Sequence, residues 1–235
     1  MDNAYLKSGF SVEKAHKAQL FLSKFIIFED KLPNKICHIA GVDTAYIGDL
    51  AISAVVVLDY NRFNIVEVQT ATCKTVFPYV PTLLSFRELP PTLLCMKKLK
   101  MQPDILLVDG HGFAHPYRCG FASHLGIVLG IPTIGAAKSR LTGEAGEFTE
   151  DGFAYLRHKG EIVGAAVKTP TGRMVYVSVG HMVSLQTAMQ IVKHCIRHSS
   201  LPEPIRKAHQ MAKVEKKRIQ KRLGISKFVP HNCKI

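Results

Sequence analysis

ILLVDGHGFAHPYRCGFASHLG, residues 105–126, contains the clearest structural signals in this sequence. Its first four residues are apolar, which is typical of a buried strand that ends at Asp109. Residues 109–116 then hold two histidines, two glycines and a proline, and residues 119–130 have the spacing of a short helix. A strand, a loop and a helix in this order predict an α/β sheet, with the loop at the end of the strand as the first place to look for chemistry.

The segments on either side predict a mixed sheet flanked by helices. Residues 36–43 form a strand that ends at Asp43, and residues 51–60 and 64–77 continue it as an antiparallel meander. The strand at 104–109 is expected to run parallel to the first one. The remaining expected elements are a helix within residues 10–30 (Val12, Ala15, Ala18, Leu20, Phe21 and Phe25 at helical spacing), a strand at 132–139, a hairpin at 153–169, a strand at 174–180, and helices at 184–199 (Ser184 as N-cap) and 203–223 (Pro204 in its first turn).

A pair of prolines interrupts the segment 81–100. Pro90 and Pro91 lack amide donors, and Pro90 disfavours the helical conformation of Leu89. We therefore expect two helical pieces, the first of which ends near Glu88.

Length and composition indicate one domain. The chain has 235 residues, of which 47% are hydrophobic, and this suffices for one substantial core. We expect a single catalytic domain at residues 1–224 and a short basic tail at 225–235. No apolar run approaches the roughly 20 residues needed to span a bilayer, and the N-terminus lacks the zones of a secretory signal. The expectation is a soluble cytoplasmic monomer that does not bind membranes.

Cysteine and charge patterns narrow the function classes. The six cysteines are far apart and form no CxxC motif, which argues against a zinc site or a disulfide framework. The net charge is +13, and residues 204–235 contribute ten Lys and Arg residues against one acid, Glu215. A basic face of this kind favours nucleic acid as the partner, and a solvated basic tail without a specific partner is the alternative.

Two carboxylates come at the ends of apolar strands, Asp43 after IAGV and Asp109 after ILLV. If the strands are neighbours, the two side chains converge at one edge, where their burial is costly unless a cation offsets it. Mg²⁺ held by these aspartates and Glu88 would do so. A pair of N-caps or loop aspartates is the alternative.

The loop after Asp109 has backbone that a flat ligand could approach. Gly110 and Gly112 have no Cβ, so a base taken out of its stack could be recognised there by amide groups. His111 and His115 are candidates for phosphate contacts or for hydrogen bonds that stabilise the loop.

A second unusual loop is PYVP, residues 78–81. Pro78 and Pro81 stiffen it around Tyr79 and Val80. A rigid, exposed aromatic residue beside a basic site could wedge between base steps, and a buried turn tyrosine is the alternative.

Two further residues are expected near the same sheet edge. Lys138 follows the strand at 132–137 and could neutralise the charge of a scissile phosphate. His209, on the last amphipathic helix, could orient a water or transfer a proton if that helix packs over the site, and is otherwise a plain helix histidine.

Taken together, the sequence resembles the endonuclease V family of deoxyinosine-specific repair nucleases. The resemblance is carried, in the family's order, by GVDTAY, PYVPTLLSFRE, ILLVDGHGFAHPYRCGFASHLGIVLGIPTIGAAKS, VYVSVGH and LPEPIRKAH, from about residue 40 to 212. It implies a ribonuclease-H-like fold. It also implies hydrolysis of the second phosphodiester bond 3′ to the deaminated base, leaving 3′-hydroxyl and 5′-phosphate ends.

The resemblance also implies roles for individual residues. Asp43, Glu88 and Asp109 would be the catalytic carboxylates that hold Mg²⁺, with Mn²⁺ as a substitute, and His209 would lie beside them. Tyr79 would be the wedge and Lys138 the phosphate contact. The residues expected at the hypoxanthine pocket are Leu84, Gly110, Gly112, His115 and Gly120.

Four positions depart from the family pattern. Thr82 stands where glycine is usual, and Tyr117 where arginine is often found. Val179 replaces a small residue or proline, and Met182 an arginine. None of these changes removes a carboxylate, so the chemistry is expected to survive.

The resemblance implies damaged DNA, single- or double-stranded, as the partner. Two alternatives stay open at this point. One is a ribonuclease that cleaves inosine-containing RNA, and the other is a non-catalytic nucleic-acid-binding protein on the same fold.

Overall fold

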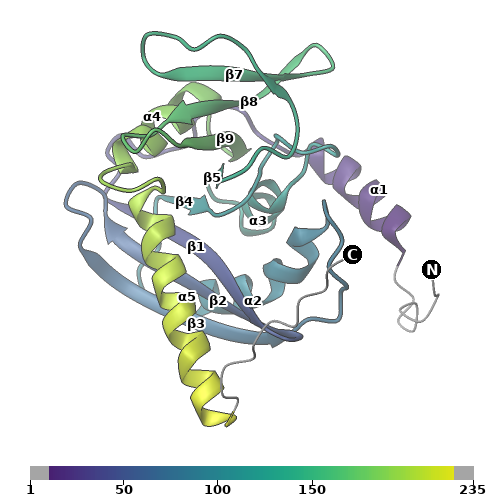
Figure 1. Cartoon of the computed structure of the whole chain (residues 1–235), viewed down its shortest axis with the longest axis vertical. Helices are drawn as coiled ribbons and strands as arrows, with labels where there is room; N and C mark the ends of the chain where they lie inside the picture. The colour runs from purple at the N-terminus through teal and green to yellow at the C-terminus, as the bar shows by residue number, and fades with distance from the viewer. Residues whose placement is uncertain (1–10, 225–235) are drawn as a thin grey trace.

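The computed structural model describes residues 11–224 and is built on one mixed sheet of nine strands in the order β3-β2-β1-β4-β5-β9-β8-β7-β6 (Figure 1). Residues 1–10 and 225–235, which include the predicted basic tail, lie outside the described residues. The strands are β1 (His38–Ile47), β2 (Leu50–Asp59), β3 (Ile65–Lys74), β4 (Ile105–Val108), β5 (Thr133–Ala137), β6 (Glu144–Ala145), β7 (Phe153–His158), β8 (Glu161–Lys168) and β9 (Met174–His181). The helices are α1 (Val12–Ser23), α2 (Leu84–Lys98), α3 (Phe121–Leu129), α4 (Leu185–Cys195) and α5 (Glu203–Arg222).

The sheet is parallel only at its centre. β4 runs parallel to β1 and to β5, whereas the other neighbouring pairs are antiparallel. The predicted meander of the first three strands and the parallel orientation of β1 and β4 are confirmed. A large mixed sheet flanked by helices is also the predicted fold class.

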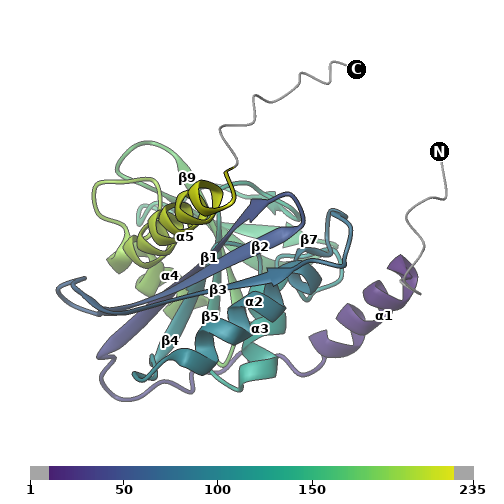
Figure 2. The ribbon, with the colours of Figure 1, turned by 90° about the horizontal axis from the view of Figure 1, so that it is seen from below.

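Helices cover both faces of the sheet (Figure 2). Side chains of α4 and α5 pack with one set of strand residues, including Ile39, Leu107 and Ile134. Side chains of α2 and α3 pack with the alternate set, including Ala40, Val42 and Leu106. This division follows from the two-residue period of a strand, and β4 is buried on both faces as its wholly apolar sequence indicates.

The predicted break at the two prolines is wrong, because α2 is one helix with Pro90 and Pro91 inside it. Interior prolines cost a helix about 3 kcal/mol or more through missing hydrogen bonds and steric clash. Packing against β2 offsets this cost. Thr92 Oγ1 lies 2.8 Å from Ser53 Oγ, and Cys95 Sγ contacts the Ser53 carbonyl oxygen at 3.3 Å. Continuity of α2 places Glu88 in the helix interior rather than at a helix end.

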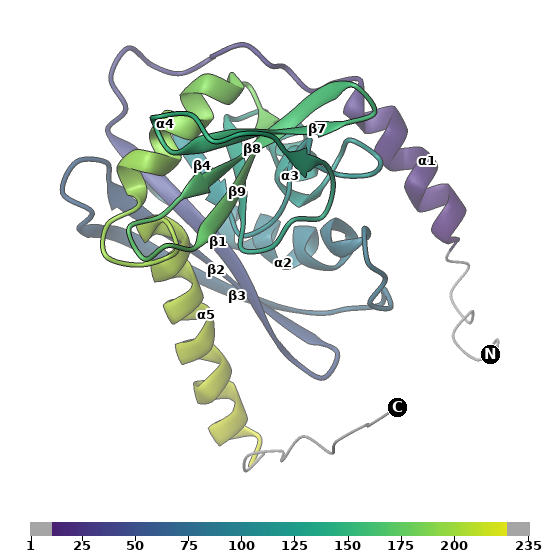
Figure 3. The same cartoon turned by 45° about the horizontal axis from the view of Figure 1, so that its top comes forward.

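The first helix ends earlier than residue 30 and lies at the margin of the molecule (Figure 3). The apolar residues Leu20, Phe21 and Phe25 face solvent, whereas Ala15 and Gln19 are buried. The helical spacing of apolar residues thus predicted the helix, but most of those residues do not contribute to the core.

Other local predictions are confirmed. Ser184 caps α4 by accepting a hydrogen bond from the Thr187 amide at 3.2 Å, and Pro204 lies in the first turn of α5. The five cysteines among the described residues are free thiols. Within residues 11–224, no helix has the length and apolar character required to cross a membrane.

Candidate active site

The register of the two central strands brings the first two carboxylates to the same level. Val42 pairs with Val108, and the Asp109 amide donates to the Val42 carbonyl at 3.0 Å, so Asp43 and Asp109 follow side by side. β4 ends there, but β1 continues to Ile47 because its antiparallel pairing with β2 does not need β4. The prediction that Asp43 ends its strand is wrong, whereas its expected place beside Asp109 is correct.

The side of the sheet on which Asp43 lies is set by strand alternation. Gly41 and Asp43 are two residues apart and share the face that α5 covers. A Cβ at Gly41 would lie 1.9 Å from the Pro204 carbonyl oxygen, so the start of α5 approaches this strand closely. Further along α5, His209 Nδ1 lies 2.6 Å from Asp43 Oδ2, with both side chains partly buried. Helix α5 therefore packs over the acids, which is the condition under which His209 was expected to act at the site.

Glu88 approaches the same edge from α2 on the opposite face. It is only 6% exposed, and the Tyr46 hydroxyl donates to its Oε1 at 3.1 Å. Its pKa is raised well above the ordinary value, because burial disfavours the charged form and the neighbouring carboxylates of Asp43 and Asp109 repel it. The carboxyl group is therefore held where its ionised form is costly.

Two basic groups partly offset the negative charge of the aspartates. Lys138 Nζ lies 2.7 Å from Asp109 Oδ2, and His209 contacts Asp43. The pKa of Asp43 is still raised, first by burial and then by repulsion from Asp109, although the His209 contact lowers it. Burial and repulsion between the acids together outweigh the effect of the His209 contact at Asp43.

The donors at this edge have the chemistry that a hard divalent ion prefers, which is carboxylate oxygen. Across the described ranges, however, no three or more His, Cys, Asp or Glu side chains form a ready-made metal site. Oxygens of the three acids are instead engaged by Lys138, His209 and Tyr46. The residues fit a cation because, within the described part of the chain, the buried Glu88 forms no ion pair, and a divalent ion would supply the missing positive charge.

A cavity of about 230 Å³ adjoins the acids. It begins directly beside them, because Gly110 follows Asp109 and Ser139 follows Lys138, and both line it. The predicted pocket residues Leu84, Gly110, His115 and Gly120 line this cavity, as do Tyr79, Val80 and Pro81 of the PYVP loop. Its other lining residues are Thr82, Ser85, His111, Phe121, Ser139, Arg140 and Leu141.

One predicted pocket residue lies elsewhere. A Cβ at Gly112 would lie 2.1 Å from the Val179 carbonyl oxygen, so this glycine permits close packing of the loop on β9. At Gly110 the nearest atoms to such a Cβ belong to Phe121, at an ordinary 3.7 Å. The opening toward the cavity therefore belongs to Gly110, and Pro78 also lies outside the residues that line it.

Both loop histidines are held neutral. Burial lowers the pKa of His111 and of His115 to about 4. His115 Nε2 lies 3.0 Å from the Thr82 carbonyl oxygen and must donate to it, while its Nδ1 accepts from the Tyr117 amide at 3.2 Å. A neutral ring with one donor suits a base pocket better than a phosphate site, since the ring carries no charge.

Tyr79 is 72% exposed, on the loop between β3 and α2 at the mouth of the cavity. This placement decides between the two alternatives raised by the sequence, since a buried turn tyrosine would be covered. A rigid aromatic side chain is thus presented to solvent beside the cavity.

Some residues at the site carry little sequence signal. Tyr46 lies three residues after Asp43, so strand alternation alone puts it on the other face of the sheet, toward α2. Ser139, Arg140 and Leu141 directly follow Lys138, and this adjacency was the only sign of their place. Among the departures from the family pattern, Val179 accepts a hydrogen bond from the Phe113 amide, and Met182 exchanges backbone bonds with Ile27 and Lys31.

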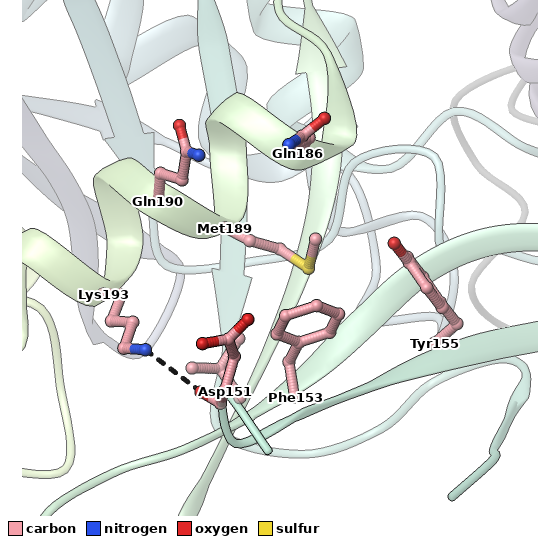
Figure 4. A pocket seen from close by; sticks show the side chains of 8 residues that line it. Asp151, Phe153, Tyr155, Gln186, Met189, Gln190 and Lys193 are labelled. Atoms are coloured by element: carbon pink, nitrogen blue, oxygen red, sulfur yellow. Dashed lines mark hydrogen bonds between the residues drawn. The ribbon is translucent and has the colours of Figure 1, made fainter. Parts of the chain in front are cut away.

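A larger cavity, of about 420 Å³, lies far from the acids between α4 and the β7–β8 hairpin (Figure 4). Met189 extends from α4 toward Phe153 there, and Lys193 Nζ donates to the Asp151 carbonyl at 3.0 Å. No pair of acids faces it among its lining residues, Asp151, Phe153, Tyr155, Val167, Gln186, Met189, Gln190 and Lys193.

Comparison with known proteins gives consistent matches. A family model described as Endonuclease V matches residues 21–210. A protein named Endonuclease V from Thermofilum pendens is 46% identical over 209 residues, which cover 88% of this chain and 90% of that protein.

Solved structures agree. Endonuclease V from Streptomyces avermitilis superposes with a TM-score of 0.83 at 35% identity, covering 89% of this chain and 95% of that one. Endonuclease V from Ciona intestinalis, in complex with a 24mer DNA containing an inosine followed by a ribo-adenosine, gives a TM-score of 0.77 at 31% identity, covering 88% of this chain and 98% of that one.

Proposed function

The chain belongs to the endonuclease V family, and from this premise we propose that it nicks DNA at the second phosphodiester bond 3′ to a hypoxanthine, leaving 3′-hydroxyl and 5′-phosphate ends. It is a nuclease that acts on phosphodiester bonds of DNA and recognises deaminated bases. The proposal adds the position of the cut, Mg²⁺ as the metal, and the roles of the residues.

The observation that carries the proposal is the contact between the acid cluster and the cavity. Asp109 and Lys138 form an ion pair at the sheet edge, and the residues that follow each of them line the cavity. A base held in the cavity therefore leaves its 3′ phosphates within reach of the acids. The base would be read by backbone groups at Gly110, while His115 fixes the wall of the cavity through its contacts with Thr82 and Tyr117.

The roles of the protein groups follow from their places. Tyr79 fills the gap that the extruded base leaves in the stack. Lys138 is half exposed and turns from Asp109 to a phosphate oxygen, where it offsets negative charge. His209 orients a water or accepts its proton, and the hydrogen bond to Asp43 fixes its ring.

Asp43, Glu88 and Asp109 would hold the Mg²⁺. When bound there, the ion polarises the phosphate and lowers the pKa of a water. The chain itself supplies the three carboxyl groups at the edge. The hydroxyl of Tyr46 keeps Glu88 directed into the cluster.

The test is an incision assay on a duplex with one central deoxyinosine, compared with an undamaged duplex, in Mg²⁺, in Mn²⁺ and in chelator. We expect a single nick with Mg²⁺, none with chelator and none on undamaged DNA. The length of the product gives the position of the cut. Sealing by a DNA ligase, which needs a 3′-hydroxyl and a 5′-phosphate, gives the chemistry of the ends. A cut at another position, or equal cutting in chelator, would contradict the proposal.

A second candidate is cleavage of inosine-containing RNA. It is favoured by the ligand of the Ciona intestinalis structure, in which a ribo-adenosine follows the inosine. Matched DNA, RNA and single-ribonucleotide substrates, each with one inosine, distinguish the two. Faster cutting at a ribonucleotide would make RNA the preferred substrate.

A further inference from the structure

Thr82 is held in an unfavourable backbone conformation at the end of the PYVP loop. Its φ is +80°, in the left-handed region that favours glycine, and a β-branched side chain makes this conformation costlier. Thr82 also lines the candidate base cavity together with Tyr79. Other contacts must therefore stabilise the PYVP loop in this conformation, and Thr82 forms several of them.

Two side chains donate to the carbonyl oxygen of Thr82. Gln19 Nε2, from α1, donates to it at 2.8 Å and to the Cys119 carbonyl at 3.0 Å. His115 Nε2 approaches the same Thr82 oxygen at 3.0 Å. Gln19 thus connects the PYVP loop with the loop before α3, and residues of both loops line the cavity.

The side chain of Gln19 is fully buried, and its Oε1 has no hydrogen-bond partner among residues 11–224. A buried amide with an unsatisfied oxygen costs free energy. An apolar residue would avoid that cost, so the two hydrogen bonds that Gln19 donates are the reason for an amide at this position.

A second contact from α1 meets both departures from the family pattern that lie near the cavity. His16 Nε2 is 2.9 Å from Thr82 Oγ1, and the His16 ring stacks on Tyr117 with centroids 3.8 Å apart. His16 and Gln19 precede residue 21, where the match to the family model begins. Thr82, Tyr117 and α1 therefore form one connected group.

The way α1 is attached supports this. Phe21 is 60% exposed on its outer side, while the inner side carries Ala15, His16 and Gln19. Hydrophobic burial is therefore not the main interaction that docks this helix. The helix is instead attached by the hydrogen bonds that His16 and Gln19 form with the loops around the cavity.

We propose that α1 is a latch for the lesion-recognition loop, in which Gln19 is a positioning residue that holds Thr82 in its strained conformation. The latch sets the place of Tyr79 and the outer wall of the base cavity. The inference rests on the proposed function, because it assigns the latch to selection of the damaged base rather than to the cutting step.

The experiment measures binding in an Asp109→Ala background, in which the DNA stays intact. Gln19→Met removes the donors but keeps the side-chain volume. The probe is a duplex with one deoxyinosine beside a 2-aminopurine, whose fluorescence rises when the neighbouring base leaves the stack. We expect Gln19→Met to weaken binding of the inosine duplex about tenfold, the effect of losing two hydrogen bonds, and to reduce the fluorescence rise. Binding of undamaged duplex should change less than twofold.

Thr82→Gly provides a second, independent variant. Glycine adopts positive φ without strain, so the loop needs the latch less. Gln19→Met should then weaken inosine binding only about twofold when combined with Thr82→Gly, and the difference is the coupling between the two positions. Lys17→Ala, on the exposed side of α1 where Lys17 pairs with Glu13, is the matched control and should change nothing.

Two results would overturn the latch. One is an equal loss of binding for inosine and undamaged duplexes, since α1 would then be merely structural. The other is the same loss from Gln19→Met with threonine or glycine at position 82. If the Asp109→Ala parent itself does not prefer the inosine duplex, the proposed function fails and the latch with it, and the parent alone reveals that outcome.

Discussion

Two of the cavities among the described residues, the one at the sheet edge and the groove between α4 and β7, differ in the charged groups around them as well as in size. The cavity at the sheet edge is the smaller, about 230 Å³, and it adjoins three acids of which one is almost fully buried. The groove between α4 and β7 is about 420 Å³ and is lined by aromatic and apolar side chains, two glutamines and one ion of each sign.

The difference shows that volume is a poor guide to chemistry. At the sheet edge, the pKa values of Asp43 and Glu88 are raised because burial and mutual repulsion make their charged forms costly. Perturbed pKa values of this kind cluster at functional sites. In the groove, Lys193 donates to a backbone carbonyl, and the one acid among the lining residues, Asp151, is exposed to water.

The largest expected effect is that of Asp109→Ala. It removes a carboxylate from the centre of the cluster and leaves Lys138 without its partner. We expect Mg²⁺-dependent nicking to fall by about 10³-fold or more, a barrier increase of about 4 kcal/mol. Single-turnover cleavage of the inosine duplex measures it, and near-normal turnover would remove the assignment of the acids.

Glu88→Gln should lose activity but gain stability. We expect nicking to fall about 10²-fold, while the free energy of unfolding in chelator rises by about 1 kcal/mol, since a neutral amide relieves the repulsion. The folded-state pKa of Glu88 is raised, so its penalty is absent at acid pH and grows as the pH rises through that pKa. The gain should therefore be larger at pH 8 than at pH 4.

Urea unfolding at both pH values measures this gain. Glu144→Gln, at an exposed position in β6, is the matched control and should change neither property. A loss of stability at pH 8 would mean that the charge of Glu88 is compensated in the protein, and the contrast between the two cavities would weaken.

Tyr79→Ala tests recognition rather than chemistry. Base stacking on an aromatic side chain is worth about 1–3 kcal/mol, so preference for the inosine duplex should fall about tenfold or more. Tyr79→Phe should keep most of the preference, because the ring is retained. The measurement is the ratio of kcat/KM on inosine and undamaged duplexes. An equal loss with phenylalanine would mean that the hydroxyl, not the ring, makes the contact.

The sequence predicts best where local signals and tertiary packing agree. The apolar runs before Asp43 and Asp109 predicted the two strands, and their convergence followed once the structure showed the strands to be neighbours. The continuity of α2 was not predictable, because the local preference of Pro90 and Pro91 is overridden by contacts with β2 that lie far away in the sequence. The exposure of apolar residues on α1 has the same cause. The polar residues His16 and Gln19 of this helix form hydrogen bonds with loops that the sequence does not show to be near.

The site divides in the same way. His209 and Lys138 were placed correctly, because the elements before them are regular. Gly112 was assigned to the pocket because a glycine in a loop indicates that another group approaches the backbone closely. The sequence does not show whether that group is a ligand or another part of the protein. Only the structure shows that the approaching atoms belong to Val179.

The basic face of α5 should have a smaller effect, and one that depends on salt. Neutralising Lys216, Lys217, Lys221 and Arg222 together should reduce the dependence of log K on log salt by about 0.9 for each duplex phosphate that these side chains neutralise. Binding titrations of inosine duplex between low and moderate salt measure the slope. The slope should change equally for undamaged DNA, because phosphate contacts carry no sequence information. An unchanged slope would mean that this face points away from the substrate.

The smallest effect is expected in the large groove. Gln190→Ala and Lys193→Ala together change two exposed side chains on α4 and remove the bond to the Asp151 carbonyl. Nicking should stay within twofold, and the free energy of unfolding within about 0.5 kcal/mol, as for ordinary surface substitutions. The inosine incision assay measures nicking, and urea unfolding of the same protein preparation measures stability. A tenfold loss of nicking without a loss of stability would show that the groove belongs to the catalytic apparatus, and charge would then be no better a guide than volume.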